Sequence, residues 1–231
     1  SLTDLTRKHG ALMLWDASHA VGAIEMDFDK NGVDIAVGCT YKYGNSGPGS
    51  PAWLYVNKKV QAQLQVPIQG WFSQGDQFAM GPNFEKAEGI RGFQVASPSL
   101  IGLRCIKSAF GMIEEAGIGA ISEKAAIGTE MMIQLYDAWL ADLGFTLLTS
   151  RNPQERGGHI SLGHPDADRI CVALREFADV IPDYRTPDSI RLAIAPLPTA
   201  YVEVWDGFAR IRDLVSSRQY EKIKKSDSRV T

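Results

Sequence analysis

VDIAVGCTYKYGNSGPG, residues 33–49, is the stretch from which the fold can be inferred. Its apolar first part predicts a buried strand, and its last part, rich in Gly, Pro, Asn and Ser, predicts a loop. Lys42 lies between the two. An earlier apolar run at residues 11–15 predicts a second buried strand and is followed by Asp16. Ligands of open α/β sheets bind at the carboxyl ends of the strands, so both charged side chains lie where a ligand site is expected.

Composition places the chain among ordinary globular proteins. It has 231 residues, 45% hydrophobic and 22% charged, which is enough for one large or two small domains. Its 24 basic and 27 acidic residues leave a net charge of -3, the wrong sign for a protein that binds nucleic acid. No apolar run is long enough for a membrane span, and the first residues carry no targeting signal, so neither a membrane nor a nucleic-acid partner is expected.

The three cysteines indicate the compartment and argue against a metal site. Cys39, Cys105 and Cys171 are an odd number without a CxxC pair, so neither a disulfide framework nor a zinc site is predicted. This pattern fits a reducing, cytoplasmic location.

Further elements follow from hydrophobic spacing. We expect a strand at residues 52–56, an irregular excursion at 58–98 and a helix at 99–116 that ends at Gly117. A second helix is expected at 121–143 with Gly144 as its C-cap. The apolar faces expected for the two helices are Leu100, Leu103, Ile106, Phe110 and Ile113 in the first, and Ile127, Met131, Leu135, Ala138 and Trp139 in the second.

The remaining chain predicts a separate small α/β domain. Strands are expected at residues 145–148, 159–162 and 190–195, and helices at 166–177 and 200–216. We therefore expect domains at 1–115 and 116–217, and a frayed or disordered tail at 218–231.

Asp16 and Lys42 could form a simple ion pair at the sheet edge. The same pair is also what a pyridoxal phosphate (PLP) site requires, because the amine forms the Schiff base and the acid keeps the pyridine nitrogen protonated. His19, three residues after Asp16, and the glycine-rich surroundings of Lys42 favour the second interpretation.

At this point the chain resembles the kynureninases, PLP-dependent enzymes of tryptophan breakdown. The Tyr41-Lys42-Tyr43 stretch with its Gly-Pro-Gly loop is similar to theirs, whereas cysteine desulfurases and class V aminotransferases usually place His before the lysine. Further similar motifs follow in the family's order: Gly70-Trp71, Phe93, Ser97-Pro98, residues 156–162, His164-Pro165, residues 185–191 and Ala195-Pro196-Leu197.

The resemblance implies a fold, an activity and a partner. The fold would be that of fold type I PLP-dependent transferases: the C-terminal part of the large mixed-sheet domain followed by a small α/β domain, without the N-terminal part. The enzyme would hydrolyse the Cβ–Cγ bond of L-kynurenine or 3-hydroxykynurenine to an anthranilate and L-alanine. Its cofactor would be PLP, and a homodimer would form the active site at the subunit interface.

The resemblance also implies a role for each site residue near the cofactor. Lys42 would form the Schiff base and then move protons, and Asp16 would pair with the pyridinium nitrogen. His19 would line the cofactor. Tyr41 would hydrogen-bond the phosphate and supply a proton to the reaction.

Three further residues would act at the edges of the site. Trp71 and Ser97 would reach the cofactor phosphate across the dimer interface. Arg191, a charge within an apolar strand, would clamp the substrate α-carboxylate, although a structural salt bridge is the alternative from the residues alone.

The substrate stays open, and so do two other hypotheses about function. The chain departs from the family at Phe72-Ser73-Gln74, where Trp-Gly-His is usual, and at Ala96-Ser97, so the substrate is open. A different PLP enzyme, an aminotransferase or a desulfurase, is the second hypothesis. The third is an inactive fragment that needs an N-terminal partner.

Overall fold

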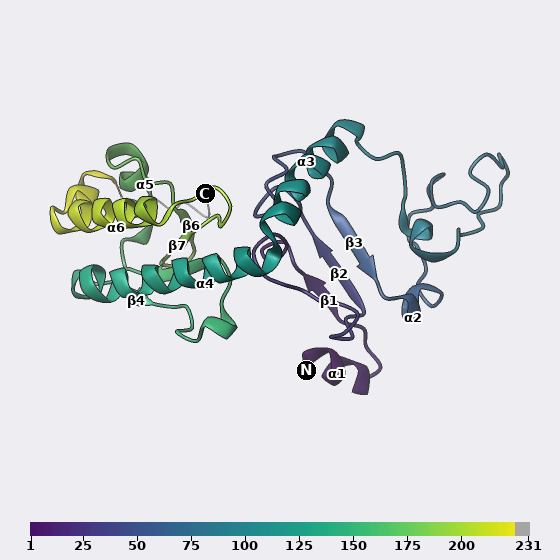
Figure 1. Ribbon diagram of the computed structural model, residues 1–231, viewed down its shortest axis with the longest axis horizontal. Helices are drawn as coiled ribbons and strands as arrows, with labels where there is room; N and C mark the ends of the chain where they lie inside the picture. Colours follow the sequence, from purple (N-terminus) through teal and green to yellow (C-terminus); the bar gives the residue numbers. More distant parts are fainter. Residues whose placement is uncertain (225–231) are drawn as a thin grey trace. The chain divides into compact units, whose positions relative to one another are not determined.

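A computed structural model of the chain describes residues 1–224 and divides the chain into two compact units. The N-terminal unit is Ser1–Glu115 and the C-terminal unit is Ala116–Thr231 (Figure 1). Each unit contains its own sheet. No helix within residues 1–224 is both long and apolar enough to cross a membrane.

A three-stranded mixed sheet forms the centre of the N-terminal unit. Its strands are β1 (Leu14–Asp16), β2 (Ile35–Gly38) and β3 (Trp53–Val56), in the order β1-β2-β3. β1 runs parallel to β2, and β3 runs antiparallel to it. The three predicted strands are confirmed, and the parallel pair brings the carboxyl ends of β1 and β2 to one edge (Figure 1).

The prediction that the first strand is buried is wrong. Leu14 is 58% exposed and Trp15 is 37% exposed. The reason is its position: β1 lies at the edge of the sheet, and β2 is its one strand partner among the described residues. α1 (Leu2–Lys8) packs nearby, where Arg7 Nε donates to Oδ1 of the buried Asp34 at 3.1 Å.

The rest of the N-terminal unit is largely irregular, as expected for residues 58–98. It contains α2 (Lys58–Gln61), the short 3-10 helix η1 (Gly89–Phe93) and then the long helix α3 (Leu100–Ala116). Helix α3 is confirmed, but its expected apolar face is only partly covered: Leu100 is 75% and Leu103 40% exposed, and Ile106, Phe110 and Ile113 are half-buried. The buried positions of α3 are Gly102 and Ala109, because small residues allow its close approach to the loop at Pro51.

The C-terminal unit contains a four-stranded antiparallel sheet. Its strands are β4 (Thr146–Leu147), β5 (His159–Gly163), β6 (Asp183–Arg185) and β7 (Ser189–Ala193), in the order β4-β5-β7-β6. Three of these strands were predicted. β6 was not, because three residues with one apolar side chain give no readable period.

Helices α4 (Ile118–Leu135), α5 (Ala167–Phe177) and α6 (Tyr201–Ser216) complete this unit, with α4 extended by a π turn (Tyr136–Leu140) and the 3-10 helix η3 (Ala141–Leu143). Gly144 ends the segment at φ 87°, which confirms the predicted cap. The predicted face of this helix is confirmed in part: Leu135 is buried and Met131 and Trp139 pack against the core, whereas Ile127 is 50% exposed and Ala138 is exposed.

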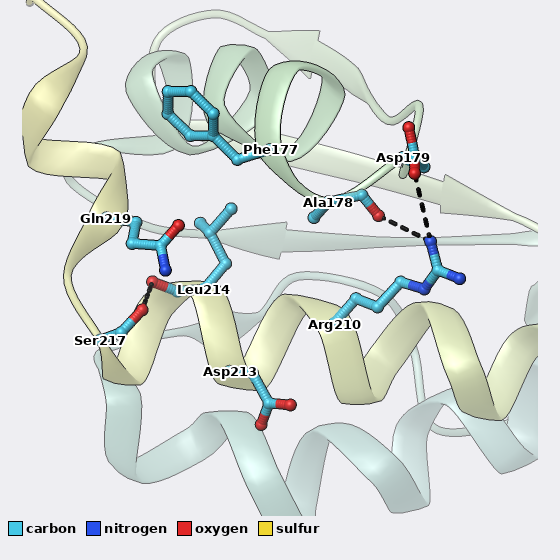
Figure 2. A pocket seen from close by; sticks show the side chains of 8 residues that line it. All are labelled: Phe177, Ala178, Asp179, Arg210, Asp213, Leu214, Ser217 and Gln219. Atoms are coloured by element: carbon cyan, nitrogen blue, oxygen red, sulfur yellow. Dashed lines mark hydrogen bonds and ion pairs between the residues drawn. The ribbon is translucent and has the colours of Figure 1, made fainter.

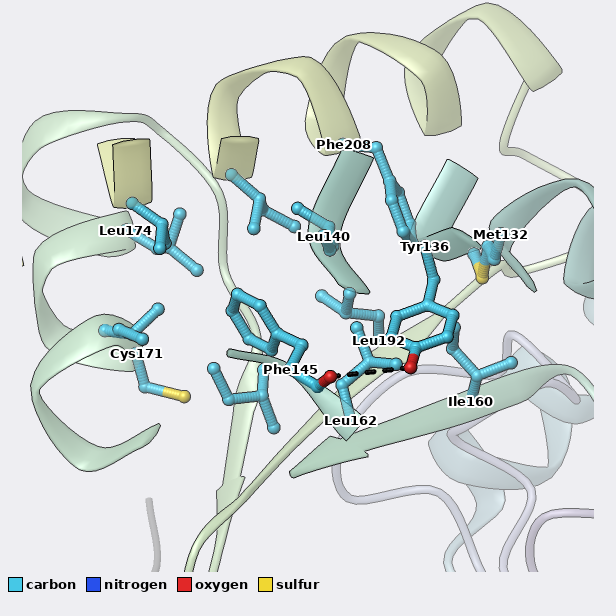
Figure 3. Packing of buried hydrophobic residues seen from close by; sticks show 14 of the residues in the cluster. Met132, Tyr136, Leu140, Phe145, Ile160, Leu162, Cys171, Leu174, Leu192 and Phe208 are labelled. Carbon is cyan, nitrogen blue, oxygen red and sulfur yellow. Dashed lines mark hydrogen bonds between the residues drawn. The ribbon is translucent and has the colours of Figure 1, made fainter. Parts of the chain in front are cut away.

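The core of the C-terminal unit joins these helices to the sheet (Figure 3). Leu140, Ile160, Leu162 and Leu174 are fully buried in it. Within the cluster the Tyr136 hydroxyl donates to the Phe145 carbonyl at 3.4 Å (Figure 3). The 3-10 helix η4 (Pro153–Glu155) lies in the loop before β5.

The expectation of a frayed tail from residue 218 is wrong as far as residue 224. The 3-10 helix η5 (Gln219–Lys222) follows α6, and Tyr220 is buried in the core. Arg169 holds this segment by donating to the carbonyls of Glu221 at 2.7 Å and Ile223 at 2.8 Å. Residues 225–231 lie outside the described residues.

Candidate functional site

The carboxyl-terminal edge of the β1–β2 pair carries the candidate site. Asp16 ends β1 and lies opposite Val37, while Lys42 follows four residues after β2 ends at Gly38. Asp16 Oδ1 accepts a hydrogen bond from the Ser18 N–H at 2.9 Å. Hydrogen bonds from Ser18 lower the pKa of Asp16 most, and the nearby charge of Lys42 lowers it further. The carboxylate is therefore ionised at neutral pH.

A compact loop fixes the backbone around Lys42. Asn45 N–H donates to the Lys42 carbonyl at 3.0 Å, and Ser46 N–H donates to the Thr40 carbonyl at 3.2 Å. The Thr40 hydroxyl in turn donates to the Pro51 carbonyl at 2.8 Å. These bonds close the glycine- and proline-rich loop on itself, so the position of Lys42 is set by the loop and by β2 together.

Gly22 is the point at which the turn after β1 touches the loop after β2. Its φ is +79°, and a Cβ placed there would lie 2.4 Å from the Tyr43 carbonyl oxygen. A side chain at this position would push the two loops apart. No role was predicted for Gly22, although a glycine in a turn beside a site is a signal in the sequence.

His19 and Tyr41 occupy the same edge, with different neighbours. The ring of His19 lies 6.4 Å from that of the buried Tyr43, in an edge-to-face arrangement. Tyr41 is 47% exposed, and Lys42 Nζ lies 5.8 Å from the centre of its ring. The structure thus brings Asp16, Lys42 and Tyr41 to one edge and places His19 beside Tyr43.

Trp71 and Ser97 lie in the irregular excursion of the same unit. Trp71 is 49% exposed and packs edge-to-face against Phe72 at 4.7 Å and Phe78 at 6.4 Å. A hollow of about 280 Å³ adjoins the Trp71 side chain. Ser97 is exposed. The ring contacts of Trp71 are with its own loop.

Arg191 belongs to the C-terminal unit. It lies in β7 and forms an ion pair with Asp183 of β6, in which its Nε donates to Asp183 Oδ2 at 3.0 Å. The salt bridge that the residues alone suggested is therefore present. Asp183 was not singled out from the sequence, because β6 itself was not recognised.

A separate cavity of about 510 Å³ lies between the carboxyl end of α5 and helix α6 (Figure 2). Arg210, the basic residue that lines it, already donates to the Ala178 carbonyl at 3.0 Å and lies 3.8 Å from Asp179. The Ser217 hydroxyl donates to the Leu214 carbonyl at 3.1 Å. Both side chains are thus bonded to the protein itself, and none of the predicted site residues lines this cavity.

Comparisons with known proteins relate the chain to one family. A family model described as the kynureninase C-terminal domain matches residues 121–211. The kynureninase of Pseudomonas fluorescens is 33% identical to the chain over 220 residues, and that of Burkholderia mallei (strain SAVP1) is 35% identical over 220 residues. Each match covers 95% of this chain and 53% of the relative, so the chain spans about half the length of the curated relatives it matches.

Solved structures show the fold. A cysteine desulfurase from Thermococcus onnurineus NA1 matches with a TM-score of 0.75 at 18% identity, over 94% of this chain and 55% of that one. A C-DES mutant with glycine covalently linked to its PLP cofactor matches with a TM-score of 0.68 at 19% identity, over 84% of this chain and 49% of that one. The predicted fold class, the C-terminal part of a fold type I PLP enzyme, is confirmed.

Proposed function

The chain is a homologue of the kynureninases, and from this homology we propose that it is the lysine-bearing part of a PLP-dependent kynureninase. The reaction is hydrolysis of the Cβ–Cγ bond of L-kynurenine or 3-hydroxykynurenine, which gives an anthranilate and L-alanine. The observation that carries the proposal is the placement of an ionised Asp16 and of Lys42 at one edge of a parallel strand pair.

The residues present fit the cofactor. A carboxylate whose pKa is held below its usual value can remain charged beside a protonated pyridine nitrogen. A primary amine at the same edge can bond to the cofactor aldehyde. When bound, PLP supplies an electron sink that stabilises negative charge at the substrate Cα.

Four predicted site residues of the N-terminal unit then have defined roles. Asp16 accepts the hydrogen bond of the pyridine nitrogen and keeps its proton in place. Lys42 Nζ would hold the cofactor aldehyde and would act as the base and acid for the proton of the substrate Cα. The Tyr41 hydroxyl would donate a hydrogen bond to the phosphate, and Tyr41 is 47% exposed. His19, beside Tyr43, lines the cofactor.

Substrate binding is assigned to the C-terminal unit. Arg191 presents a guanidinium group on the sheet and is 20% exposed, which suits a two-point contact with the substrate α-carboxylate. Trp71 and Ser97 are proposed to reach the phosphate of a second copy, so the active enzyme is a homodimer. The exposure of both side chains supports this assignment, because they are free to meet another chain.

Other PLP chemistry is less well supported by the structure. A desulfurase needs a cysteine that can move to its substrate. Here Cys39 directly follows β2, Cys105 lies in α3 and Cys171 is buried in α5. Burial raises the pKa of Cys171 to about 12, which makes its thiol a poor nucleophile.

Borohydride reduction in the presence of PLP tests the proposal. We expect a covalent pyridoxyl group on the peptide that contains Lys42, located by mass spectrometry, and none in Lys42→Ala. Lys59→Ala, in the short helix α2, is the matched control and should be labelled like the unmodified chain. Labelling of Lys42→Ala to the same extent would contradict the assignment.

Product analysis separates kynureninase chemistry from its alternatives. Anthranilate fluorescence is expected on addition of L-kynurenine, measured with the chain alone and together with a polypeptide corresponding to the rest of its relatives. Labelling at Lys42 together with fluorescence only in the mixture would identify a site completed by that polypeptide. Labelling at Lys42 without anthranilate in either sample would favour an aminotransferase.

A further inference from the structure

The sheet of the C-terminal unit has a polar face on which Arg191 is central. Side chains of β7 alternate, with Ile190 and Leu192 in the core and Arg191 on the other face. Arg191 lies opposite Asp183 of β6 on one side and opposite Ser161 of β5 on the other. Of these two residues only Asp183 is an anion, so only Asp183 can accept a charge-assisted hydrogen bond from the guanidinium group.

Asp183 fixes the plane of the Arg191 guanidinium. Both Nε and Nη2 of Arg191 donate to Asp183 Oδ2, Nε at 3.0 Å. Two bonds from adjacent nitrogens leave little freedom for rotation of the planar group. Nη1 receives no hydrogen-bond partner from the residues that the structure describes, so one side of the guanidinium is available to a ligand.

The charges of this cluster do not cancel. Arg185, also in β6, donates from Nη2 to the same Asp183 oxygen at 3.2 Å. Burial raises the pKa of Asp183, but the bonds and charges of Arg191 and Arg185 outweigh this effect and hold it below its usual value. One carboxylate therefore faces two guanidinium groups, and the pair with Arg185 leaves the positive charge of Arg191 incompletely neutralised.

We propose that Asp183 is a positioning residue for carboxylate recognition: it orients Arg191 so that Nη1 meets a ligand carboxylate, while Arg185 offsets the charge of Asp183. This inference rests on the proposed function, in which Arg191 binds the substrate α-carboxylate. It adds to that function two residues, Asp183 and Arg185, and a reason for the orientation of the guanidinium group.

A second aspartate–arginine pair of the same unit shows the contrast. Arg151 donates from Nη1 to Asp137 at 2.8 Å and from Nη2 at 2.7 Å, one bond to each carboxylate oxygen. There the outer edge of the guanidinium is closed by its own aspartate. Asp137→Asn is therefore a matched control, because it removes an Asp–Arg pair from the same unit without touching Arg191.

Binding of two small probes tests the inference without the cofactor. β-Benzoylpropionate has a carboxylate and an aryl ketone, whereas butyrophenone has the ketone alone. Titrations followed by NMR of the arginine Nε–H groups give the Kd of each probe for the chain, for Asp183→Asn, for Arg185→Gln, for Arg191→Gln and for Asp137→Asn. The ratio of the two Kd values isolates the contribution of the carboxylate.

We expect Asp183→Asn to weaken β-benzoylpropionate binding about five- to tenfold and to leave butyrophenone within about twofold, a loss typical of one charge-assisted contact. Arg185→Gln should weaken the carboxylate probe by a smaller factor, and Asp137→Asn should change neither. Unchanged or tighter binding of β-benzoylpropionate to Asp183→Asn, with loss of binding in Arg191→Gln, would overturn the positioning role alone. Absence of carboxylate-dependent binding in the unmodified chain, or its persistence in Arg191→Gln, would overturn the carboxylate site itself.

Discussion

Asp16, the last residue of β1, lies opposite Val37 in the parallel pairing with β2. Because β1 and β2 run in the same direction, the chain segments that follow them both begin at the same edge of the sheet. Asp16 and the loop with Lys42 are close for this reason, although 26 positions separate them in the sequence (42 − 16). Hydrogen bonds from Ser18 lower the pKa of Asp16 most, and the charge of Lys42 lowers it further.

The first prediction concerns this carboxylate. Asp16→Asn keeps the shape of the side chain but removes the charge that holds a proton on the pyridine nitrogen. We expect the affinity for PLP, measured by absorbance titration, to fall about tenfold or more, as for loss of a charge-assisted hydrogen bond. Asp142→Asn, an exposed aspartate of η3, serves as control. Equal affinities for PLP in the two variants would contradict the role of Asp16.

The second prediction uses two glycines with similar backbone angles. Gly22 and Gly47 have φ of +79° and +81°, but only Gly22 lacks space, since its Cβ would lie 2.4 Å from the Tyr43 carbonyl oxygen. Gly47→Ala should cost about 1 kcal/mol in free energy of unfolding, from backbone strain alone. Gly22→Ala should cost about 2–4 kcal/mol, because overpacking adds to the strain.

Hydrogen exchange of residues 40–46, followed by mass spectrometry, distinguishes these effects. We expect faster exchange in Gly22→Ala and reduced PLP labelling of Lys42, because the two loops must separate. Gly47→Ala should label normally. Similar exchange in both variants would show that the contact of Gly22 with Tyr43 does not hold the loop.

The sequence was informative where apolar runs are short and bounded by glycine or proline. The three strands of the N-terminal sheet and the edge shared by Asp16 and Lys42 follow from such signals. For α4 hydrophobic spacing correctly predicted that Leu135 is buried, but it was wrong for Ile127, which is 50% exposed. The helix also packs through small residues: a Cβ on Gly128 would lie 2.6 Å from Ile194 Cδ1. Close packing selects small side chains, and hydrophobic periodicity alone does not reveal them.

The partner of Arg191 could not be predicted for a related reason. A charge in an apolar strand indicates that a partner exists, but the partner is set by strand register. Asp183 lies in a strand of three residues with one apolar side chain, which no period reveals. The roles of Trp71 and Ser97 stay predictions, because they depend on a second copy of the chain.

The third prediction concerns the loop between η4 and β5. The Arg156 side chain is 1% exposed, donates to the Thr129 hydroxyl at 3.1 Å and to the Arg151 carbonyl at 2.6 Å, and pairs with Glu130 at 2.6 Å. Arg156→Ala should lower the free energy of unfolding by about 2–4 kcal/mol, since the buried Thr129 hydroxyl loses a donor and the buried Arg156 side chain leaves a gap. Urea denaturation measures this loss.

Arg151→Ala is the matched control for Arg156. Its guanidinium forms an exposed pair with Asp137, and exposed pairs contribute little to stability. We expect its urea midpoint to remain close to that of the unmodified chain. A larger loss for Arg151→Ala than for Arg156→Ala would contradict the bracing role of Arg156.

The last prediction concerns His164, a buried histidine of the C-terminal unit. Its Nδ1 accepts the Asp166 N–H at 3.0 Å, and its ring lies 4.8 Å from that of Phe145 and 6.0 Å from that of Tyr220. Burial lowers the pKa of His164, and the charge of Asp166 and a hydrogen bond with the Leu143 backbone offset this only in part. NMR titration should therefore place its midpoint below about 6.5, the usual value for histidine.

The direction of the pH effect on stability follows from this depressed pKa. Above the unfolded-state pKa both states hold a neutral His164, and its contribution to stability is complete. As the pH falls from about 7 to about 5, the unfolded state binds a proton at His164 more readily than the folded state does. The contribution of His164 to the free energy of unfolding therefore decreases as the pH approaches the folded-state pKa. The urea midpoint of the C-terminal unit should fall more over this range than that of His164→Gln, which does not titrate. Parallel pH profiles for the two proteins, or a midpoint of titration above the usual value, would contradict this account of His164.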